Sequence, residues 1–421
     1  MKTYKHLYET MMRPETVAKC ALDAAEGKLR RKEVLSAFVH FDETYDRVIA
    51  CANNPDYVPC ENNTHEIIDG ANHKLREIEK PMFCPEQILH HMIIEPFKPV
   101  LMDGLYEQVY DCLPPLTKTM PDGKVKIVKR FGPHAAIKQL TKWVQIGKKV
   151  YVVEADVHQA YGSVRIPTLA RKMRRAIRDA EWLRLTCQFL HYKLDDPALE
   201  EMCGLILGHY TSPWFFNFYL KNFDHFAAAL PGVKYLRFAD NLFLVGTNKR
   251  KVHSALNAIR AYLWTELSLE LNRSAQVYRF EYEDRQGNIR GRAINALGAI
   301  IHYNRVTLRK SILMRTRRKS KRIAKKEKRT WHDGASMFSR LSWIRKTNTY
   351  KYYEKHIKPN INTRQLKAKV RKHSREMQAI IEERRRIIYD GLEKSARLAS
   401  GKAEGVRHGD ERGNRLPAQE H

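Results

Sequence analysis

The alternation of hydrophobic and polar positions is most regular in the middle of the chain. Residues 149–155 form an apolar run, which predicts a buried strand that leads directly into Asp156. Residues 234–246 predict a strand, a tight turn and a second strand, with Asp240 in the turn. Residues 249–266 carry an apolar stripe at helical spacing. This order of elements predicts an α+β domain built around an antiparallel sheet.

The segments on either side of this domain have different patterns. Residues 1–80 are polar and mostly helical in pattern, which predicts a helical, basic N-terminal extension. Residues 81–147 begin with an apolar-faced helix, which we expect Pro96 to interrupt, and continue as a basic segment punctuated by glycine. Residues 301–392 are basic and mainly helical. Residues 393–421 lack an apolar pattern and are predicted to be a disordered tail.

The charge of the chain indicates a polyanionic partner. There are 76 Lys and Arg residues against 47 Asp and Glu residues, a formal net charge of +29. A generally basic, well-solvated protein would also have a positive total. Here, however, residues 305–330 alone hold thirteen Lys or Arg residues and one acid, Glu327. This clustering favours binding to a nucleic acid.

Cysteine spacing and the lack of long apolar runs indicate the compartment. The seven cysteines are Cys20, Cys51, Cys60, Cys84, Cys112, Cys187 and Cys203. Their number is odd and no two are spaced like a zinc knuckle, so we expect reduced core residues. The first residues lack the apolar stretch of a signal peptide, and no apolar run could span a bilayer. The sequence therefore predicts a cytoplasmic protein with no membrane partner.

Two carboxylates carry the candidate chemistry. Phosphoryl transfer from a nucleoside triphosphate uses two divalent cations about 4 Å apart, held by carboxylates on rigid elements. An aspartate at the end of a strand and another at the tip of a neighbouring hairpin can meet this need. Asp156 and Asp240 occupy such positions in the predicted sheet. Either residue alone would more often be a cap or a turn residue, so the prediction depends on the surrounding sequence.

The surrounding sequence resembles the palm motifs of reverse transcriptases, in the same order and with approximately the same spacing. The motifs are Asp156-Val-His-Gln-Ala-Tyr-Gly-Ser-Val164, Gly204-Leu-Ile-Leu-Gly-His-Tyr-Thr-Ser-Pro-Trp-Phe-Phe-Asn-Phe-Tyr-Leu220 followed by Asp224, Tyr235-Leu-Arg-Phe-Ala-Asp-Asn241, Leu267-Ser-Leu-Glu-Leu-Asn272 and Ala296-Leu-Gly-Ala299. A set of motifs is far more specific than any single one. The resemblance implies a right-hand polymerase with fingers at 81–147, a palm at 148–300 and a helical thumb at 301–392.

Within this family, the chain is most similar to the prokaryotic enzymes of diversity-generating retroelements and to related phage or defence-associated reverse transcriptases. The opening Lys-x-Leu-x-Glu pattern, Gly132-Pro-His-Ala-Ala136 and Thr307-Leu-Arg-Lys-Ser311 carry this similarity. The chain looks less like a retron enzyme, because the Asn-Ala-x-x-His signature of that group is missing.

The resemblance assigns the metal site. It implies that Asp156 and Asp240 bind two Mg²⁺ ions, helped by the Val157 carbonyl and by Asn241, with Mn²⁺ as an alternative metal. The family hairpin normally ends in two aspartates, so Asn241 is a departure. An amide oxygen can still approach a metal ion but carries no charge. We therefore expect a slow or manganese-tolerant enzyme.

The resemblance also assigns residues around the incoming nucleotide. Tyr161 would block a ribose 2′-hydroxyl and so favour deoxynucleotides. Gly208 would let the backbone approach the templating base pair closely. Leu207 stands where many members have Gln, which indicates low fidelity, although ordinary loop variation explains it equally well. Ser212 is expected to cap the helix that Pro213 begins.

Two groups of cations are expected to contact phosphates. Lys129 and Arg130 are the candidates for a clamp on the nucleotide triphosphate, with a solvated basic hairpin as the alternative. A second group follows the palm and should line the thumb face that binds duplex. Its members are Arg309, Lys310, Arg315, Arg317, Arg318, Lys321 and Arg322.

The predicted function is RNA-templated DNA synthesis. The expected partners are template RNA, the DNA product and deoxynucleoside triphosphates, and an accessory protein would fit a retroelement setting. Three alternatives remain: a catalytically degenerate RNA-binding protein, a template-independent or protein-primed defence polymerase, and an RNA-synthesising enzyme. Tyr161 argues against the last, because its side chain would exclude ribonucleotides.

Overall fold

A four-stranded antiparallel sheet with the order β6-β7-β5-β8 lies at the centre of the chain. The strands are β5 (Tyr151–Asp156), β6 (Lys234–Phe238), β7 (Asn241–Gly246) and β8 (Gln276–Arg279). This is the arrangement that the hydrophobic pattern predicts. The computed structural model of the protein describes residues 3–59, 63–68, 75–120, 123–146, 149–194 and 196–409.

Both faces of this sheet are buried, which explains why β7 is apolar from Leu242 to Val245. Leu242 and Leu244 belong to a large core shared with the helices α9 (Ser212–Ala229) and α10 (Lys249–Leu267). Phe243 points the other way, into a second core with α6 (Pro133–Val144). Since side chains alternate along a strand, a strand covered on both faces needs apolar residues at every position.

The helices and strands around the sheet complete an α+β fold. The central helices are α5 (Ile88–Met102), α7 (Ile166–Ala176) and α8 (Ala180–Phe189). Three short strands, β11 (Ile294–Ala296), β12 (Ala299–Ile301) and β13 (Val306–Leu308), form a second antiparallel sheet. Two hairpins, β3 (Leu116–Thr119) with β4 (Val125–Lys129) and β9 (Tyr282–Glu283) with β10 (Ile289–Arg290), extend from the body. The short turns η1 (Phe83–Gln87), η2 (Pro197–Leu199) and η3 (Lys358–Asn360) join longer elements.

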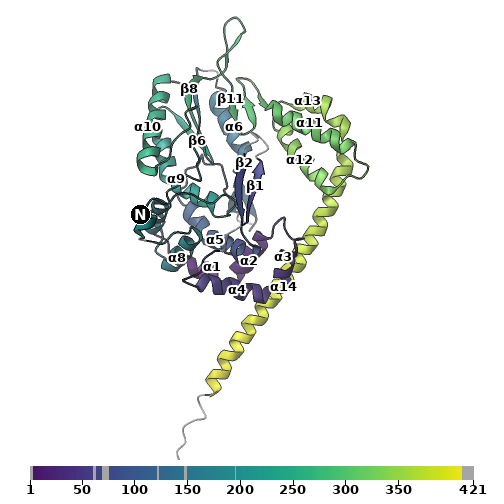
Figure 1. The fold of residues 1–421 in the computed structure, drawn as a ribbon. Coiled ribbons are helices and arrows are strands. Elements are labelled where there is room, and N and C mark those ends of the chain that lie inside the picture. Colours follow the sequence, from purple (N-terminus) through teal and green to yellow (C-terminus); the bar gives the residue numbers. More distant parts are fainter. Residues whose placement is uncertain are drawn as a thin grey trace, which may run out of the picture.

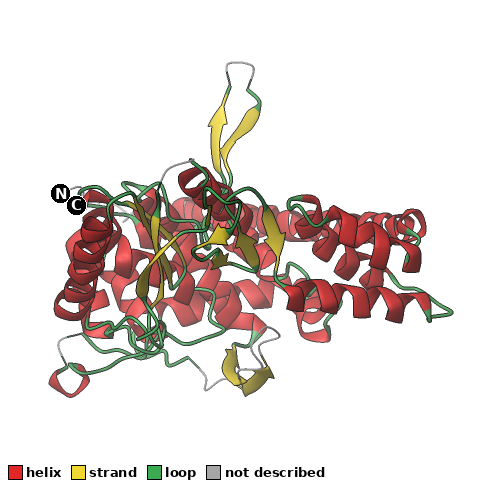
Figure 2. Ribbon diagram, turned by 90° about the horizontal axis from the view of Figure 1, so that it is seen from above, coloured by secondary structure: helices red, strands yellow, loops and turns green. Residues whose placement is uncertain are grey.

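The C-terminal part forms a separate helical module, which extends to one side of the molecule when seen from above (Figure 2). It consists of α11 (Lys310–Ala324), α12 (Trp331–Arg345), α13 (Tyr350–His356) and the start of α14 (Thr363–Gly409). Its own core includes Ile323, Met337, Leu341 and Leu366. The helix α14 then turns back toward the N-terminal helices, so that the elements are arranged as a ring in Figure 1. Arg30 and Glu376 form an ion pair of 3.6 Å across this junction.

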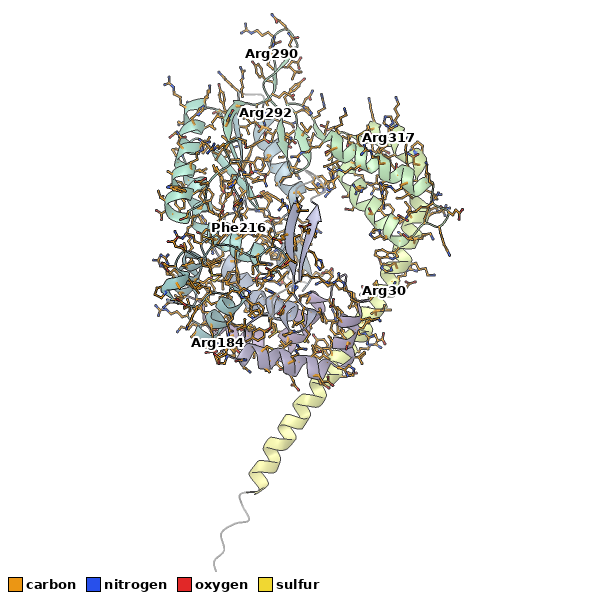
Figure 3. The ribbon with its side chains drawn as sticks, in the orientation of Figure 1. Arg30, Arg184, Phe216, Arg290, Arg292 and Arg317 are labelled. Atoms are coloured by element: carbon orange, nitrogen blue, oxygen red, sulfur yellow. The ribbon has the colours of Figure 1, made fainter. Side chains whose placement is uncertain are left out.

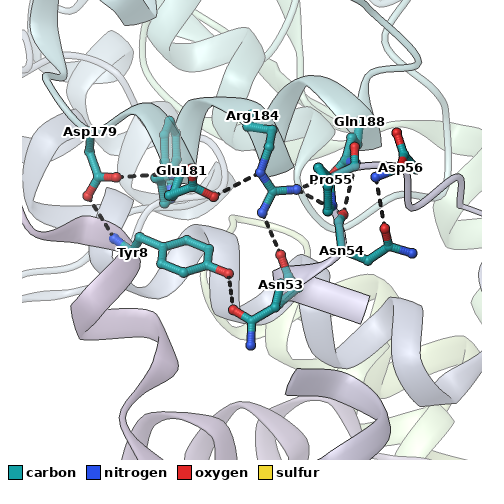
Figure 4. A network of polar contacts seen from close by, with 11 residues as sticks. Tyr8, Asn53, Asn54, Pro55, Asp56, Asp179, Glu181, Arg184 and Gln188 are labelled. Carbon is teal, nitrogen blue, oxygen red and sulfur yellow. Dashed lines mark hydrogen bonds and ion pairs between the residues drawn. The ribbon is translucent and has the colours of Figure 1, made fainter. Parts of the chain in front are cut away.

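The N-terminal extension is fixed to the centre by polar contacts on α8 (Figure 4). The extension consists of α1 (Leu7–Met12), α2 (Pro14–Ala24), α3 (Lys32–Val39) and α4 (Phe41–Asn53). At the end of α4, the Arg184 guanidinium donates to the carbonyls of Ala52 at 2.6 Å and Asn54 at 3.0 Å. The Asp179 carboxylate accepts from the backbone N–H of Tyr8 at 2.9 Å. These bonds satisfy carbonyls at the C-terminal end of α4.

Three features differ from the sequence-based predictions. Residues 63–80 form a hairpin, β1 (Asn63–Ile68) with β2 (Leu75–Lys80), inside the segment that was expected to be mostly helical. Pro96 does not interrupt α5, which continues to Met102 because its apolar side chains, among them Ile93 and Phe97, are completely buried. Finally, α14 extends to Gly409, into the segment predicted to be disordered, and residues 410–421 lie outside the described part.

The described cysteines are all free, as the sequence predicts. Only Cys20 and Cys187 are buried, whereas Cys112 and Cys203 are exposed, so not all of them are core residues. Cys60 lies outside the described residues. Among the described helices, none is both long and apolar enough to cross a membrane.

Candidate active site

The two predicted catalytic aspartates meet at one end of the central sheet. Asp156 is the last residue of β5 and lies directly opposite Asn241 of β7. Asp240 lies in the tight turn between β6 and β7, where Ala239 has a positive φ of 52°. The Val157 N–H donates to the Asp240 carbonyl at 3.0 Å and so joins the turn to the end of β5.

The electrostatics of Asp240 show that charged groups from several elements converge here. Burial raises the pKa of Asp240 above its usual range, and the negative charges of Asp156 and Asp111 raise it further. The positive charge of Arg76, on β2, lowers it. A buried carboxylate beside other carboxylates favours either a proton or a cation. The pair of aspartates is therefore suited to hold a cation.

The chemistry of these oxygen donors fits Mg²⁺ or Mn²⁺, which prefer carboxylate and carbonyl ligands. Asp156 and Asp240 supply the carboxylates, and the backbone carbonyl of Val157 follows Asp156 directly in the chain. Among the described residues, no group of three or more His, Cys, Asp or Glu side chains is arranged to hold a metal ion.

Asn272 orients Asp156. Its side-chain amide donates to the Asp156 carboxylate, and its backbone N–H donates to the Asp156 carbonyl at 2.9 Å. Its amide oxygen lies 3.1 Å from Nδ1 of His158. Asn272 is the last residue of one of the motifs identified in the sequence, but only the structure shows what it contacts.

Asn241 contacts the second aspartate. Its side-chain amide donates to Oδ1 of Asp240 at 2.7 Å. An aspartate at this position could not donate and would add a third negative charge. In the structure, Asn241 therefore acts as a hydrogen-bond donor to a metal-binding candidate.

A buried ion pair between Arg237 and Asp224 stabilises the β6–β7 hairpin. Arg237 of β6 and Asp224 of α9 are both completely buried and form a bidentate pair with two contacts of 2.7 Å. The same guanidinium also donates to the Asn217 side chain at 2.8 Å and to the Ala239 carbonyl at 3.2 Å. Burial alone would lower the pKa of Arg237, but the charge of Asp224 raises it overall. Arg237 thus fixes the turn that carries Asp240.

Tyr161 lies near Asp111 and Asp240. Its ring stacks on Phe216 of α9 with centroids 5.0 Å apart, and Figure 3 shows Phe216 in the central part of the molecule. Burial raises the pKa of Tyr161, and the nearby charges of Asp111 and Asp240 also raise it. The phenol is therefore disfavoured from ionising and lies close to the Asp240 carboxylate.

The loop around Gly208 is in contact with the N-terminal hairpin. Gly208 has a φ of 107°, and a Cβ there would lie 2.0 Å from the Glu79 carbonyl oxygen of β2. The Glu79 N–H donates to the Leu207 carbonyl at 2.8 Å, and the Glu79 carboxylate lies 3.4 Å from the buried His209. The close approach that Gly208 permits is therefore made here by β2.

Ser212 has a different role from the predicted cap. Thr211 is the N-cap residue of α9, and Ser212 is already helical. The Ser212 hydroxyl is buried and donates to the Ile206 carbonyl at 2.6 Å, which closes the loop on itself. Ser212 thus shapes the Leu207–Gly208 turn.

Among the contacts of the described residues, none joins Lys129 or Arg130 of the predicted triphosphate clamp to Asp156 or Asp240. The Lys129 ammonium donates to the Glu107 carbonyl and lies 5.3 Å from the Tyr110 ring centroid. Burial lowers the pKa of Lys129. Arg130 is exposed to solvent. The cation that acts on Asp240 is Arg76, which the sequence analysis missed because it lies in a polar hairpin with no recognised motif.

The predicted duplex-binding cations lie on one helix of the C-terminal module. Lys310, Arg315, Arg317, Arg318, Lys321 and Arg322 are on α11, and Arg309 precedes it. Arg309 donates to the Asn295 carbonyl at 3.0 Å and so has a structural partner. Figure 3 shows Arg317 on this module, on the other side of the ring from α10.

One comparison with known proteins identifies the central domain. Residues 113–282 match the family model described as "Reverse transcriptase (RNA-dependent DNA polymerase)". This range contains both aspartates and the whole central sheet. It shows a nucleotidyltransferase domain of the RNA-directed DNA polymerase type, and it confirms the predicted α+β, right-hand polymerase class. No curated protein matches the chain.

Two telomerase structures are among the solved structures that are similar to the chain. One is apo telomerase from Candida tropicalis, truncated from the C-terminal domain, with 10% identity, a TM-score of 0.38 and coverage of 59% of this chain and 55% of that chain. The other is telomerase from Candida albicans in complex with a fragment of telomeric RNA, with 9% identity, a TM-score of 0.40 and coverage of 72% of this chain and 57% of that chain. The chain thus spans just over half of the length of each.

The buried pair makes a testable prediction about stability. Replacing Asp224 by Ala leaves the Arg237 charge buried without its carboxylate, which should lower the free energy of unfolding by about 3–5 kcal/mol. Denaturant unfolding followed by circular dichroism measures the change. Asp46→Ala, at an exposed position on α4, is the control and should change stability by less than about 0.5 kcal/mol. Equal effects of the two variants would show that the pair does not support the hairpin.

Proposed function

We propose that this protein copies an RNA template into DNA by two-metal nucleotidyl transfer, with Asp156 and Asp240 as the metal ligands. The observation that carries the proposal is the convergence of these carboxylates at the end of the central sheet, inside the matched domain. In this proposal, residues 81–147 act as fingers, 148–300 as palm and 301–392 as thumb, with residues 1–80 as an N-terminal extension.

The chain's own residues prepare the site for the metal ions. Asp156, Asp240 and the Val157 carbonyl would hold Mg²⁺ or Mn²⁺, and Asn272 keeps the Asp156 carboxylate oriented. When bound, the ions lower the pKa of the primer 3′-hydroxyl and neutralise charge on the leaving pyrophosphate. The Arg237–Asp224 pair holds the turn in place, which preserves the spacing of the two aspartates.

Substrate selection follows from Tyr161 and the charge distribution. The Tyr161 ring is held by Phe216 and would lie beneath the sugar of the incoming nucleotide, where a ribose 2′-hydroxyl would collide with it. The cations of α11 would contact the backbone of the template–product duplex between palm and thumb. We place the enzyme in a retroelement, phage or phage-defence setting, on the basis of the motifs that the sequence shares with such enzymes.

Primer extension tests the proposal directly. The wild-type chain should extend a DNA primer on an RNA template with deoxynucleotides and Mg²⁺ or Mn²⁺, and Asp156→Asn should reduce extension by at least about a hundredfold. The exposed Asp46→Asn is the matched control and should leave activity unchanged.

The outcomes of this assay separate the alternatives. Synthesis without added template or primer would support a protein-primed or template-independent polymerase. RNA binding with no synthesis in either metal would indicate a degenerate, binding-only protein and would overturn the proposal. Equal activity of wild type and Asp156→Asn would overturn the assignment of the metal site.

Asn241 gives a second prediction. Replacing it by Asp removes the hydrogen bond to Asp240 and adds a negative charge, so the metal-free variant should unfold at a lower temperature. The added carboxylate should strengthen Mg²⁺ binding, restore the stability and increase Mg²⁺-dependent extension relative to Mn²⁺. Asn257→Asp, on the exposed face of α10, is the control. If Asn241→Asp shows no gain with Mg²⁺, the amide does not limit the activity.

Tyr161 gives a third prediction. Replacing it by Ala should remove the steric barrier and increase the incorporation of ribonucleotides relative to deoxynucleotides by at least about tenfold. Competition between the two nucleotide types in primer extension measures the ratio. Tyr350→Ala, 52% exposed in the C-terminal module, should leave the ratio unchanged. An unchanged ratio for Tyr161→Ala would remove its role in sugar selection.

A further inference from the structure

A cavity lined by several basic residues lies away from the catalytic hairpin. A cavity of about 730 Å³ lies between α5, α7, α9 and α10. We call it the helical pocket. Its basic residues are Arg171, Lys172, Arg175, Lys221 and His225. None of its lining residues comes from β5, β6 or β7, so it is separate from the proposed metal site.

The two lysines of the helical pocket, Lys172 and Lys221, are partly buried, and their ammonium groups donate hydrogen bonds to neutral backbone carbonyls. The Lys172 ammonium donates to the Tyr219 carbonyl at 2.6 Å and lies 4.8 Å from the Tyr219 ring centroid. The Lys221 ammonium donates to the carbonyls of Val100 and Asp103. Burial lowers the pKa of both lysines, for Lys172 to about 8. These positive charges are therefore held at an energetic cost that a carboxylate contact would reduce.

The acids of the helical pocket offset its positive charge only in part, because burial lowers the pKa of Lys221 more than the charge of Asp103 raises it. Asp103 accepts a hydrogen bond from the Tyr4 hydroxyl, and Glu266 is exposed at the rim. Glu266 raises the pKa of Lys172 only in part, because burial outweighs it and the charge of Arg175 opposes it. Across the described residues, the ion pairs include none that involves Lys172, Arg175 or Lys221 with a carboxylate.

The size and lining of the pocket indicate which anion it would take. Arg171 pairs with Glu200 at 3.8 Å. The two ammonium groups and the Arg175 guanidinium, from α7 and α9, favour a ligand with several negative charges in a small volume, such as a chain of phosphates. The rest of the lining mixes apolar and aromatic residues, among them Phe218 and Tyr262, with the polar Thr168 and Asn222 and the two acids, which suits a base or sugar. A volume of about 730 Å³ lies within the range of pockets that hold ligands of this size.

We propose that the helical pocket is a second binding site, for a nucleoside triphosphate or for the triphosphorylated 5′ end of an RNA, with Lys172, Arg175 and Lys221 as the phosphate ligands. The helix α9 connects this site to the palm, because Lys221 faces the pocket while Asp224, three residues later, pairs with Arg237 under the catalytic turn. Binding does not require catalysis, so this site would exist even if the proposed polymerase activity were absent.

Lysine labelling tests the site in the full-length chain. The protein is treated with an amine-acylating reagent at pH 8 in EDTA, where Lys172 is reactive because of its lowered pKa, and each lysine is quantified by mass spectrometry. ATP should protect Lys172 and Lys221 several-fold but leave the exposed Lys249 unprotected. EDTA removes the metal that the catalytic site would need, so protection reports on the helical pocket.

A matched pair of variants identifies the ligands. Arg175→Ala should weaken the binding of ATP, measured by calorimetry in EDTA, by about tenfold. Arg174→Ala removes the same charge from the adjacent position on α7, outside the pocket lining, and should have little effect. Equal effects of both variants would mean that general charge, not the pocket, binds ATP, and would overturn the proposal.

Two further ligands separate the sources of the anion. If a 5′-triphosphorylated RNA protects Lys172 at lower concentration than ATP, the site binds RNA ends, and if ATP is better, it binds free nucleotides. Both results support the proposal. Protection by a polyglutamate peptide but not by either triphosphate would indicate an acidic protein partner instead and would overturn it. The proposal would also fail if none of the three protects Lys172.

Discussion

The buried ion pair between Arg237 and Asp224 is the contact on which the geometry of the candidate active site depends. An ion pair in which both partners are buried is stable only when its geometry is good and its remaining hydrogen-bonding groups have partners. Here the guanidinium contacts both carboxylate oxygens, the Asn217 amide and the Ala239 carbonyl. Ala239 belongs to the β6–β7 turn, and Asp224 belongs to α9, which packs against the sheet. The pair therefore joins α9 to the turn and fixes the position of Asp240. Tyr235 adds a further hydrogen bond to Asp224 at 2.8 Å.

The sequence was sufficient for the centre of the fold and for the two aspartates, because strong local signals specify both. The apolar run of β7 and the short Ala239–Asp240 turn before it leave few other arrangements. What could not be predicted depends on tertiary contacts. The strands of the β1–β2 hairpin are polar and mostly exposed, so no alternation marks them. Pro96 remains helical because the buried side chains around it hold α5 together. Arg76 and Asn272 reach the site only through folding, from segments 80 or more residues distant from Asp156.

The group that approaches the backbone of Gly208 is different from the one that the sequence predicted. A glycine with positive φ allows a close backbone approach, and sequence similarity suggested a base pair as the approaching group. The structure has the β2 backbone in that place, tied by a hydrogen bond to Leu207 and by the Glu79–His209 contact. Burial lowers the pKa of His209, and Glu79 partly offsets this. The contacts that attach the hairpin to the loop include this backbone bond and this ion pair.

The charge balance at the aspartates explains why an asparagine can stand at position 241. Two partly buried carboxylates repel each other when no cation is present, and a third beside them would destabilise the folded chain further. Asn241 avoids that charge and donates a hydrogen bond to Asp240 instead, while Arg76 supplies a compensating positive charge. The arrangement favours a chain that stays folded without metal, and under the proposed function it would also weaken the attraction of Mg²⁺. Such a site would hold its metal ions mainly when nucleotide phosphates arrive with them, so substrate binding and metal binding would be coupled events.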